Sequence, residues 1–277
     1  MIHLNIKRIG ICFNPFKEEF LDSFDEIKGS IEKMGFEIVF SCDITTESSG
    51  CFNSEKIDLL IAFGGDGTVL KAFHSVNFKV PVMGINFGKL GFLTHYHPED
   101  IEQSLLEIKK GDFKFVDIPI YEVYHNTERF MGINDIVVSK IGTKILDISL
   151  KIDGYELGRI PADGIVVCTS LGSTAYNLSN GGSILSPKCG KVFEISFLAP
   201  HVMTARPIVV DGSEEITITT HQKDSKAHLV IDGIEIDFMN TDDTVKVSYS
   251  SKTAKLLTSN KKNFYELLKQ KIGWGKR

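Results

Sequence analysis

The segment IAFGGDGTVL, residues 61–70, combines residue types that suit phosphate chemistry: an apolar run ends in two glycines, a carboxylate, a third glycine and a threonine. A strand that ends in glycines and leads into a helix is typical of phosphate binding. The glycines let backbone N–H groups approach the anion, and the helix N-terminus adds positive charge. Open α/β sheets also bind ligands at the carboxyl ends of their strands. The predicted phosphate contacts are Gly64, Gly65, Gly67, Thr68 and Lys71.

Asp66 stands in the middle of this loop, although a carboxylate repels a phosphate held beside it. Its presence is explained if it faces a metal ion that bridges phosphates, or a sugar hydroxyl about to attack one. Both explanations point to phosphoryl transfer. The alternative is a plain Asx turn, in which Gly64 and Gly65 serve only the backbone geometry. Lys71 fits a solvated helix lysine equally well.

A second candidate segment, DGIVVCTSLGSTAYNLSNGGSILSP, covers residues 163–187. Its small hydroxyl side chains suit the polar edge of a purine and its ribose, and Tyr176 offers a ring for stacking. Taken alone, the segment is better explained as a long flexible loop that its tyrosine anchors to the core.

The first third of the chain alternates strand-like and helix-like segments. Strands are expected at RIGICFN, FEIVF, IDLLIAF and VPVMGIN, and helices at residues 16–34, 68–76 and 98–110. Such alternation indicates a parallel sheet covered on both faces. We therefore predict an α/β domain over residues 1–115 that carries the Gly-Gly-Asp-Gly loop.

The pattern changes after about residue 113 to short strands, several of which alternate apolar and polar residues. The expected strands are YEVYHN, RFMGINDIVVS, ILDISLKIDGYELGR, GIVVCTS, EEITITTH, AHLVIDGIEIDF and DTVKVSYS. Asp153-Gly154 and Asp232-Gly233 are typical of two-residue hairpin turns. The prediction is a mainly antiparallel, sandwich-like β domain over residues 116–255. Residues 256–277 contain a helical pattern, and we expect this segment to pack back on the first domain.

The composition, with 42% hydrophobic and 24% charged residues among 277, is ordinary for a globular protein. A net charge of −5 argues against a broad attraction to nucleic acid or to an anionic membrane. We find no signal peptide and no apolar stretch of bilayer length. Five scattered cysteines without a C-x-x-C motif predict reduced thiols in a cytoplasmic protein, with Cys12 and Cys168 as buried packing residues.

The sequence resembles a known family in several segments. GGDGT is shared by NAD kinases and by diacylglycerol and sphingosine lipid kinases, and phosphofructokinases have a near form. Residues 163–187 closely resemble the second NAD kinase signature, with its GSTAY core and following GG. Three further stretches resemble the family in order: GINFGKLGFLT at 84–94, INDIVVS at 133–139 and LAPHVMTARPIVV at 198–210. The chain is similar to bacterial-type NAD kinases over nearly its whole length.

The resemblance implies a reaction: transfer of a phosphoryl group from ATP, or from inorganic polyphosphate, to the 2′-hydroxyl of the adenosine ribose of NAD. Asp66 would accept the hydroxyl proton and, with Gly67, approach the ribose. Mg²⁺ would bind mainly through the donor phosphates, without a dedicated protein site. A homodimer or homotetramer is implied as well. The residues implied to bind NAD are Asp66, Gly67, Phe92, Asn134, Asp135, Asp163, Thr174, Ala175, Tyr176 and Ser179.

Two positions depart from the family pattern. Lys89 stands where the family usually has asparagine, and Asp135 stands where glutamate is commoner, which shortens the reach of the carboxylate. The pair His95 and His97 suggests a metal site, but an H-x-H without a third ligand is weak evidence. The roles of His201 and Asp232 stay open. The predicted hairpin turn is sufficient to explain why an aspartate stands at position 232.

Two other functions remain to be weighed against an NAD kinase. A lipid kinase of the diacylglycerol type would need an apolar or basic membrane-facing surface, and no such stretch stands out in the sequence. A sensor that binds NAD or NADP without turnover has no need for a carboxylate at the transfer point. The intact Gly-Gly-Asp-Gly loop therefore favours an enzyme.

Overall fold

The computed structural model describes residues 6–15, 18–45, 52–88, 91–221, 226–258 and 263–273. Contacts divide the chain into two compact units, one of residues 1–118 with 253–277 and the other of residues 119–252. Strands β6 (Lys114–His125) and β17 (Thr244–Thr258) contribute residues to both units. The sequence-based boundaries lie after residues 115 and 255.

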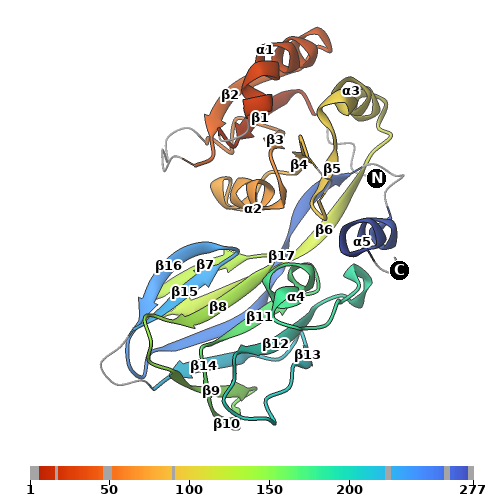
Figure 1. Cartoon of the computed structure of the whole chain (residues 1–277). Helices are drawn as coiled ribbons and strands as arrows, with labels where there is room; N and C mark the ends of the chain where they lie inside the picture. The colour runs from red at the N-terminus through yellow and green to blue at the C-terminus, as the bar shows by residue number, and fades with distance from the viewer. Residues whose placement is uncertain are drawn as a thin grey trace. The chain divides into compact units, whose positions relative to one another are not determined.

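The first unit is built on a parallel sheet in the order β4-β3-β1-β2, with β5 and the end of β17 beside β4 (Figure 1). All five residues of β3 are buried, as expected for a strand covered on both faces. This confirms the predicted parallel α/β domain. The strands are β1 (Arg8–Phe13), β2 (Glu37–Asp43), β3 (Leu59–Phe63), β4 (Val82–Ile85) and β5 (Thr94–Tyr96).

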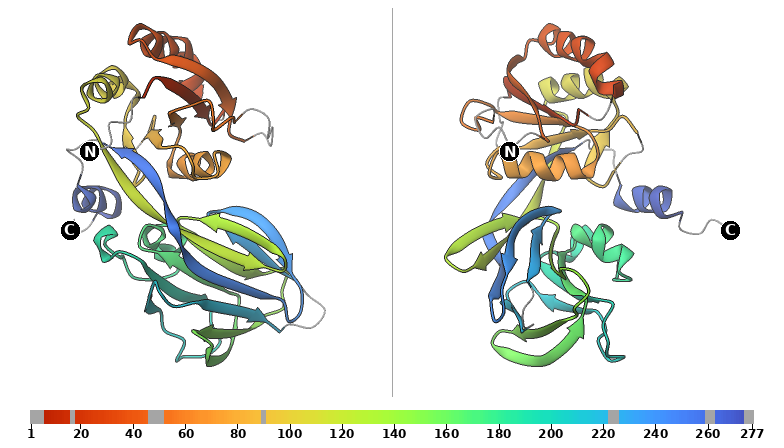
Figure 2. Two further views of the ribbon diagram at one scale, coloured as in Figure 1. Left: turned by 180° about the vertical axis from the view of Figure 1, so that it is seen from behind. Right: turned by 60° about the vertical axis from the view of Figure 1, so that its left-hand side comes forward.

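Helices cover both faces of this sheet. Helices α1 and α3 lie together on one face and α2 on the other (Figures 1 and 2). Ile31 of α1 and Leu105 of α3 pack with Ile61 of β3 in one apolar core, while Phe73 of α2 is also fully buried. The helices are α1 (Glu18–Lys33), α2 (Asp66–Ser75), η1 (Pro98–Asp100), α3 (Ile101–Lys110) and α5 (Phe264–Ile272).

The second unit consists of antiparallel strands in two sheets. One sheet has the order β13-β12-β11-β8-β15-β16, and the other contains β10-β9-β14-β17. Alternate residues face a shared core: Ile136 and Val138 belong to it and Val137 does not. This confirms the sandwich-like domain. Its strands are β7 (Glu128–Gly132), β8 (Asp135–Lys140), β9 (Leu146–Ile152), β10 (Tyr155–Ala162), β11 (Gly164–Thr169), β12 (Val192–Leu198), β13 (Ile208–Asp211), β14 (Ile216–Thr220), β15 (Ala227–Ile231) and β16 (Ile234–Met239).

Both hairpin predictions are confirmed. Asp153 and Gly154 have φ values of 48° and 78°, and Asp232 and Gly233 have 50° and 76°. Positive φ at both central residues is what a two-residue turn matching the twist of its strands requires.

Several expectations need correction. Strands β5, β12 and β13 were not expected, and the run RFMGINDIVVS is two strands interrupted at Ile133 and Asn134. Helix α2 starts at Asp66, two residues before the expected Thr68. Residues 163–187 contain β11 and two short helices, η2 (Gly172–Thr174) and α4 (Tyr176–Ser179), and a third, η3 (Pro187–Cys189), begins at the end of this range.

The cysteine prediction is wrong in one respect. Cys42 is disulfide-bonded, while Cys12, Cys168 and Cys189 are free. Scattered spacing could not reveal this, because the distance between thiols depends on the fold rather than on the sequence separation. Cys12 and Cys168 are buried, as expected, and burial raises the pKa of both thiols. In the described part of the chain, none of the helices combines the length and hydrophobicity that a membrane span requires.

Candidate active site

The carboxylate of Asp66 is fixed by the backbone of a neighbouring segment. Its Oδ2 accepts a hydrogen bond from the N–H of Phe92 at 2.8 Å, and its Oδ1 accepts from the N–H groups of Leu93 at 3.0 Å and Thr94 at 3.2 Å. The Thr94 hydroxyl donates to Oδ1 as well, at 3.2 Å. These four donors hold the carboxylate in one orientation, so an Asx turn within the loop is not its role.

Two glycines make this arrangement possible. A Cβ atom on Gly91 would lie 1.7 Å from Asp66 Oδ1, and one on Gly64 would lie 2.2 Å from Thr68 Oγ1. The glycine before Phe92 therefore lets the backbone close around the carboxylate. The glycine after β3 lets the first turn of α2 approach the strand end.

The first turn of α2 has features of an anion site. The N-cap residue is Gly65, which has no side chain to cap the helix. The first N–H groups of a helix lack intrahelical partners, so such an end is suited to an anionic ligand. Gly67 has open space at its Cβ position. Thr68 is buried and Lys71 is exposed, and Lys89 lies outside the described residues.

A lysine from the C-terminal helix also reaches Asp66. Lys271 of α5 places its Nζ 3.3 Å from Asp66 Oδ2 and 4.9 Å from the centre of the Phe92 ring. Phe264, at the start of the same helix, packs on Phe92 with 5.7 Å between ring centres. The C-terminal helix therefore returns to the first unit, as predicted, but no sequence signal linked Lys271 to the loop.

A separate group of polar residues lies in the second unit, at the junction between β7 and β8. The side chains of Asn134 and Asp135 are buried, and Oδ1 of Asn134 has no hydrogen-bond partner in the structure. Buried polar atoms are nearly always hydrogen-bonded. An orphaned amide oxygen therefore indicates a place where a ligand donor can bind.

Asp232 supports this group from the opposite hairpin. Its Oδ1 accepts hydrogen bonds from the N–H groups of Asn134 at 2.7 Å and Asp135 at 3.2 Å, and its Oδ2 accepts from that of Ile133 at 2.9 Å. The Tyr121 hydroxyl donates to Asp232 Oδ1 at 2.8 Å and to the Asp135 carbonyl at 2.7 Å. Asp232 thus has a positioning role that the turn alone did not reveal.

The Asp135 carboxylate is perturbed by its surroundings. Burial raises the pKa of Asp135 to about 7, and the charge of Asp232 adds to the shift. A hydrogen bond from the backbone of Tyr176 to Asp135 opposes it. The same bond shows that the GSTAY segment adjoins Asp135.

The GSTAY segment is rigidly supported. Gly172 lies against Asn134, since a Cβ at this position would come within 2.1 Å of the Asn134 carbonyl oxygen. Asn177 donates to buried Glu194 at 2.9 Å. Tyr176 itself is 48% exposed, so its ring is accessible for stacking. Thr174 and Ala175 are half-buried and Ser179 is exposed.

Asp163 lies away from the group formed by Asn134, Asp135 and the GSTAY segment in the described part of the second unit. It precedes β11 and pairs with Lys140, with 2.5 Å between Oδ1 and Nζ. Thr169, whose N–H bonds the Asn134 carbonyl, lies six residues later along the strand. That separation is roughly 20 Å at the rise of an extended chain.

The three histidines that the sequence analysis left open make contacts within the protein. His95 bonds the Thr258 hydroxyl through Nδ1 and the Phe92 carbonyl through Nε2 at 3.0 Å. His97 Nδ1 contacts the Asn86 carbonyl at 3.2 Å, and the backbone of His201 bonds Pro161. Among the described residues, no group of three or more His, Cys, Asp or Glu side chains is arranged to hold a metal ion.

A carboxylate fixed at the start of a helix, at the end of a strand in a parallel α/β unit, agrees with the phosphoryl transfer that the Gly-Gly-Asp-Gly-Thr loop predicted. Family models define the chain further: the ATP-NAD kinase N-terminal domain matches residues 9–113, and the ATP-NAD kinase C-terminal domain matches residues 133–259. The chain belongs to the NAD kinase family, which confirms the resemblance and the expectation of an enzyme.

Individual relatives agree with this assignment. The chain is 33% identical to an NAD kinase of Clostridium beijerinckii, covering 96% of each protein. It is 32% identical to one of Chlorobium phaeobacteroides, covering 92% of this chain and 88% of that protein. These relatives do not favour the lipid kinase and sensor alternatives.

Two solved structures are similar in fold. An NAD kinase from Archaeoglobus fulgidus in complex with ATP matches with a TM-score of 0.75 and 25% identity, over 96% of this chain and 97% of that one. Yeast NADH kinase complexed with NADH matches with a TM-score of 0.84 and 20% identity, over 98% of this chain and 89% of that one. The second likeness is evidence for the fold alone.

Proposed function

We propose that the protein transfers the terminal phosphoryl group of ATP to the 2′-hydroxyl of the adenosine ribose of NAD, giving NADP and ADP. The observation that carries this proposal is the Asp66 carboxylate, held by four donors from residues 92–94 at the first turn of α2. A phosphate site formed by backbone N–H groups alone has no use for such a carboxylate. A site in which a hydroxyl attacks phosphorus does.

Asp66 acts as the proton acceptor in this reaction. The ribose 2′-oxygen attacks the terminal phosphorus, the bond from that phosphorus to the ADP oxygen breaks, and the hydroxyl proton passes to the carboxylate. Phosphoryl transfer depends mainly on positioning and charge neutralisation. The hydrogen bonds from the N–H groups of Phe92, Leu93 and Thr94 supply the positioning, because they leave the carboxylate few alternative orientations.

NAD recognition is assigned to both groups of residues that the family resemblance implies. In the second unit, Asn134 Oδ1 accepts a hydrogen bond from a polar group of NAD, which satisfies an orphaned atom. Asp135 binds beside it, and Tyr176 stacks on adenine with its exposed ring. Thr174, Ala175 and Ser179 surround the base. Phe92 forms a wall near Asp66. The family resemblance assigns Asp163 to the nicotinamide end of NAD.

A divalent cation, Mg²⁺, accompanies the donor in this proposal. The oxygens of Asp66 already accept hydrogen bonds from backbone N–H groups, so they are not free to form a metal site. The N–H groups at the start of α2 suit phosphate oxygens, whereas Mg²⁺ requires oxygen ligands. The cation is therefore bound mainly through the donor phosphates, whose charge it neutralises. Gly64, Gly65, Gly67, Thr68 and Lys71 are assigned to those phosphates.

The biological setting is also part of the proposal. The protein works in the cytoplasm as a homodimer or homotetramer, without a nucleic acid or membrane partner. Inorganic polyphosphate is an alternative donor.

One assay tests the function directly. Purified protein is incubated with Mg²⁺, NAD and either ATP or polyphosphate, and NADP is measured with an NADP-specific dehydrogenase. ATP-dependent NADP formation is the expected result. A protein that binds NAD but forms no NADP with either donor would be a sensor, and the proposed function would be wrong.

A further inference from the structure

Lys271 lies beside Asp66, and the proposed chemistry has not yet used it. Its ammonium group lies 3.3 Å from Asp66 Oδ2, although 205 residues separate the two in sequence. The Phe92 ring lies 4.9 Å from the same ammonium group, close enough for a cation–π contact. Two independent contacts therefore hold this cation beside the carboxylate.

The helix that carries Lys271 is built to keep it there. Asn263 caps α5, since its side chain accepts a hydrogen bond from the Tyr265 N–H at 2.9 Å. Phe264 packs on Phe92 at the first turn, and Leu267 and Leu268 are buried. The position of the lysine thus follows from the docking of a whole helix rather than from one flexible side chain.

Stability gives little reason for this ion pair. The side chains of Lys271 and Asp66 are 32% and 28% exposed, and exposed pairs contribute only about 0–1 kcal/mol. Asp66 also has four other donors, so it does not need the lysine to satisfy its oxygens. A cation held beside a proton acceptor has a more direct use in phosphoryl transfer.

We propose that Lys271 is a catalytic residue whose ammonium group contacts the phosphoryl group in transit and rests on Asp66 when no donor is bound. This inference rests on the proposed function, because it needs the donor phosphate to reach Asp66. The lysine forms no covalent bond and keeps its proton. It exchanges one anionic partner, the carboxylate, for another, the transferred group, and so neutralises charge where it develops.

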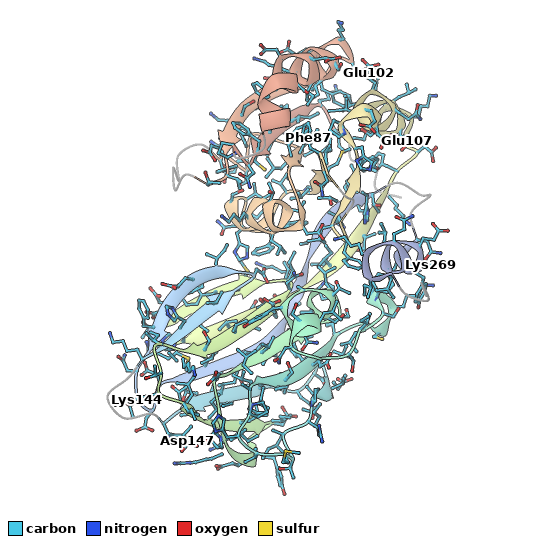
Figure 3. All side chains as sticks on the ribbon, in the orientation of Figure 1. Phe87, Glu102, Glu107, Lys144, Asp147 and Lys269 are labelled. Atoms are coloured by element: carbon cyan, nitrogen blue, oxygen red, sulfur yellow. The ribbon has the colours of Figure 1, made fainter. Side chains whose placement is uncertain are left out.

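The test compares three variants of the full-length protein. Lys271→Gln removes the charge, Lys271→Arg keeps it, and Lys269→Gln is the matched control on the exposed face of the same helix (Figure 3). We expect Lys271→Gln to lower kcat by at least about tenfold and to weaken ATP binding in calorimetry. NAD affinity should stay within about twofold. Lys271→Arg should recover part of kcat, and Lys269→Gln should behave as wild type.

Three results overturn the inference. The first is a Lys271→Gln variant with kcat within about twofold of wild type. The second is a loss of activity that is matched by equal losses of thermal stability and NAD affinity, which is a purely structural effect. The third is a gain in turnover, which would mean that the lysine blocks Asp66.

Asp66→Asn, assayed in parallel, separates this inference from the proposed function. If Asp66→Asn loses more than about tenfold in kcat while Lys271→Gln is normal, only the role of Lys271 is wrong. If Asp66→Asn keeps wild-type turnover, the proton-acceptor assignment fails and the inference about Lys271 fails with it.

Discussion

Tyr121 and Asp232, which are 111 residues apart in sequence, share a hydrogen bond of 2.8 Å in the interior of the second unit. The same hydroxyl donates to the Asp135 carbonyl, and the same carboxylate accepts from the N–H groups on either side of Asn134. A strand end, a strand interior and a hairpin turn are thereby tied at one point. That point determines where Asn134 and Asp135 can place their side chains.

Removing the Tyr121 hydroxyl should destabilise this point. In Tyr121→Phe, Asp232 and the Asp135 carbonyl keep their backbone N–H donors but lose the hydroxyl, and losing a buried hydrogen bond that involves a charged group costs about 1–3 kcal/mol. Urea unfolding should show a decrease of this size, and the Kd for NAD should rise. Tyr124→Phe is the control, because its exposed hydroxyl bonds only the Glu122 side chain in the described structure. A Tyr121→Phe protein as stable as Tyr124→Phe would contradict this assignment.

The stability of the fold should depend on pH through Asp135. Burial raises the pKa of Asp135 to about 7, well above its unfolded value near 3.9. The folded state therefore holds a proton that the unfolded state releases between these two pH values. The resulting stabilisation is complete below about pH 4 and is lost as the pH rises through about 7.

Asp135→Asn isolates this effect, since asparagine resembles the protonated carboxyl group and does not titrate. We expect the wild-type free energy of unfolding to fall between pH 4 and pH 7 relative to the variant, by at most ~1.4 kcal/mol per pH unit. Urea unfolding of both proteins at several pH values measures the difference. Parallel pH profiles for the two proteins would show that Asp135 is ionised in the folded state across this range.

Tyr176 and its neighbour Asn177 should have separable roles. Tyr176→Ala removes an exposed ring, so the free energy of unfolding should change little while the KM for NAD rises more than that for ATP. Asn177→Ala breaks buried bonds to Glu194 and Ser196, which should cost about 1–3 kcal/mol. Equal effects of Tyr176→Ala on both KM values would argue against adenine stacking. Tyr176→Phe, which keeps the ring, is the control.

The sequence predicted those elements whose physical cause is local. Strand β3 is a continuous apolar run because both of its faces are covered, and the hairpin at Asp232-Gly233 needs residues that tolerate positive φ. The loop at Gly64 could likewise be recognised, because a strand, glycines and a helix stand in direct succession.

Features that depend on distant partners could not be predicted. Strand β12 was missed although Phe193 and Ile195 alternate with Glu194 as in a strand, and only the fold shows that the buried Glu194 carboxylate accepts hydrogen bonds from Asn177 and from the N–H of Ser183. Lys271 gave no signal, since a lysine near the end of an amphipathic helix is ordinary. Asp232 was explained by its turn, which hid its bonds to residues 133–135.

Glycine substitutions offer a last test of the architecture around Asp66. In Gly91→Ala, the new Cβ would lie 1.7 Å from Asp66 Oδ1, so the carboxylate or the backbone of residues 91–94 must move. We expect kcat to fall by more than about tenfold together with a loss of stability. In Gly67→Ala, the Cβ meets open space, and alanine favours the helix by about 1 kcal/mol.

Gly67→Ala should therefore fold at least as stably as wild type and still bind ATP more weakly, because a methyl group at the helix N-terminus keeps phosphate from the backbone. Gly29→Ala in α1, where the Cβ also meets open space, controls for the gain in helix propensity. Thermal unfolding and ATP calorimetry on the three variants separate these effects. Normal ATP affinity in Gly67→Ala would place the donor phosphates away from the first turn of α2, because the added methyl group would then not meet them.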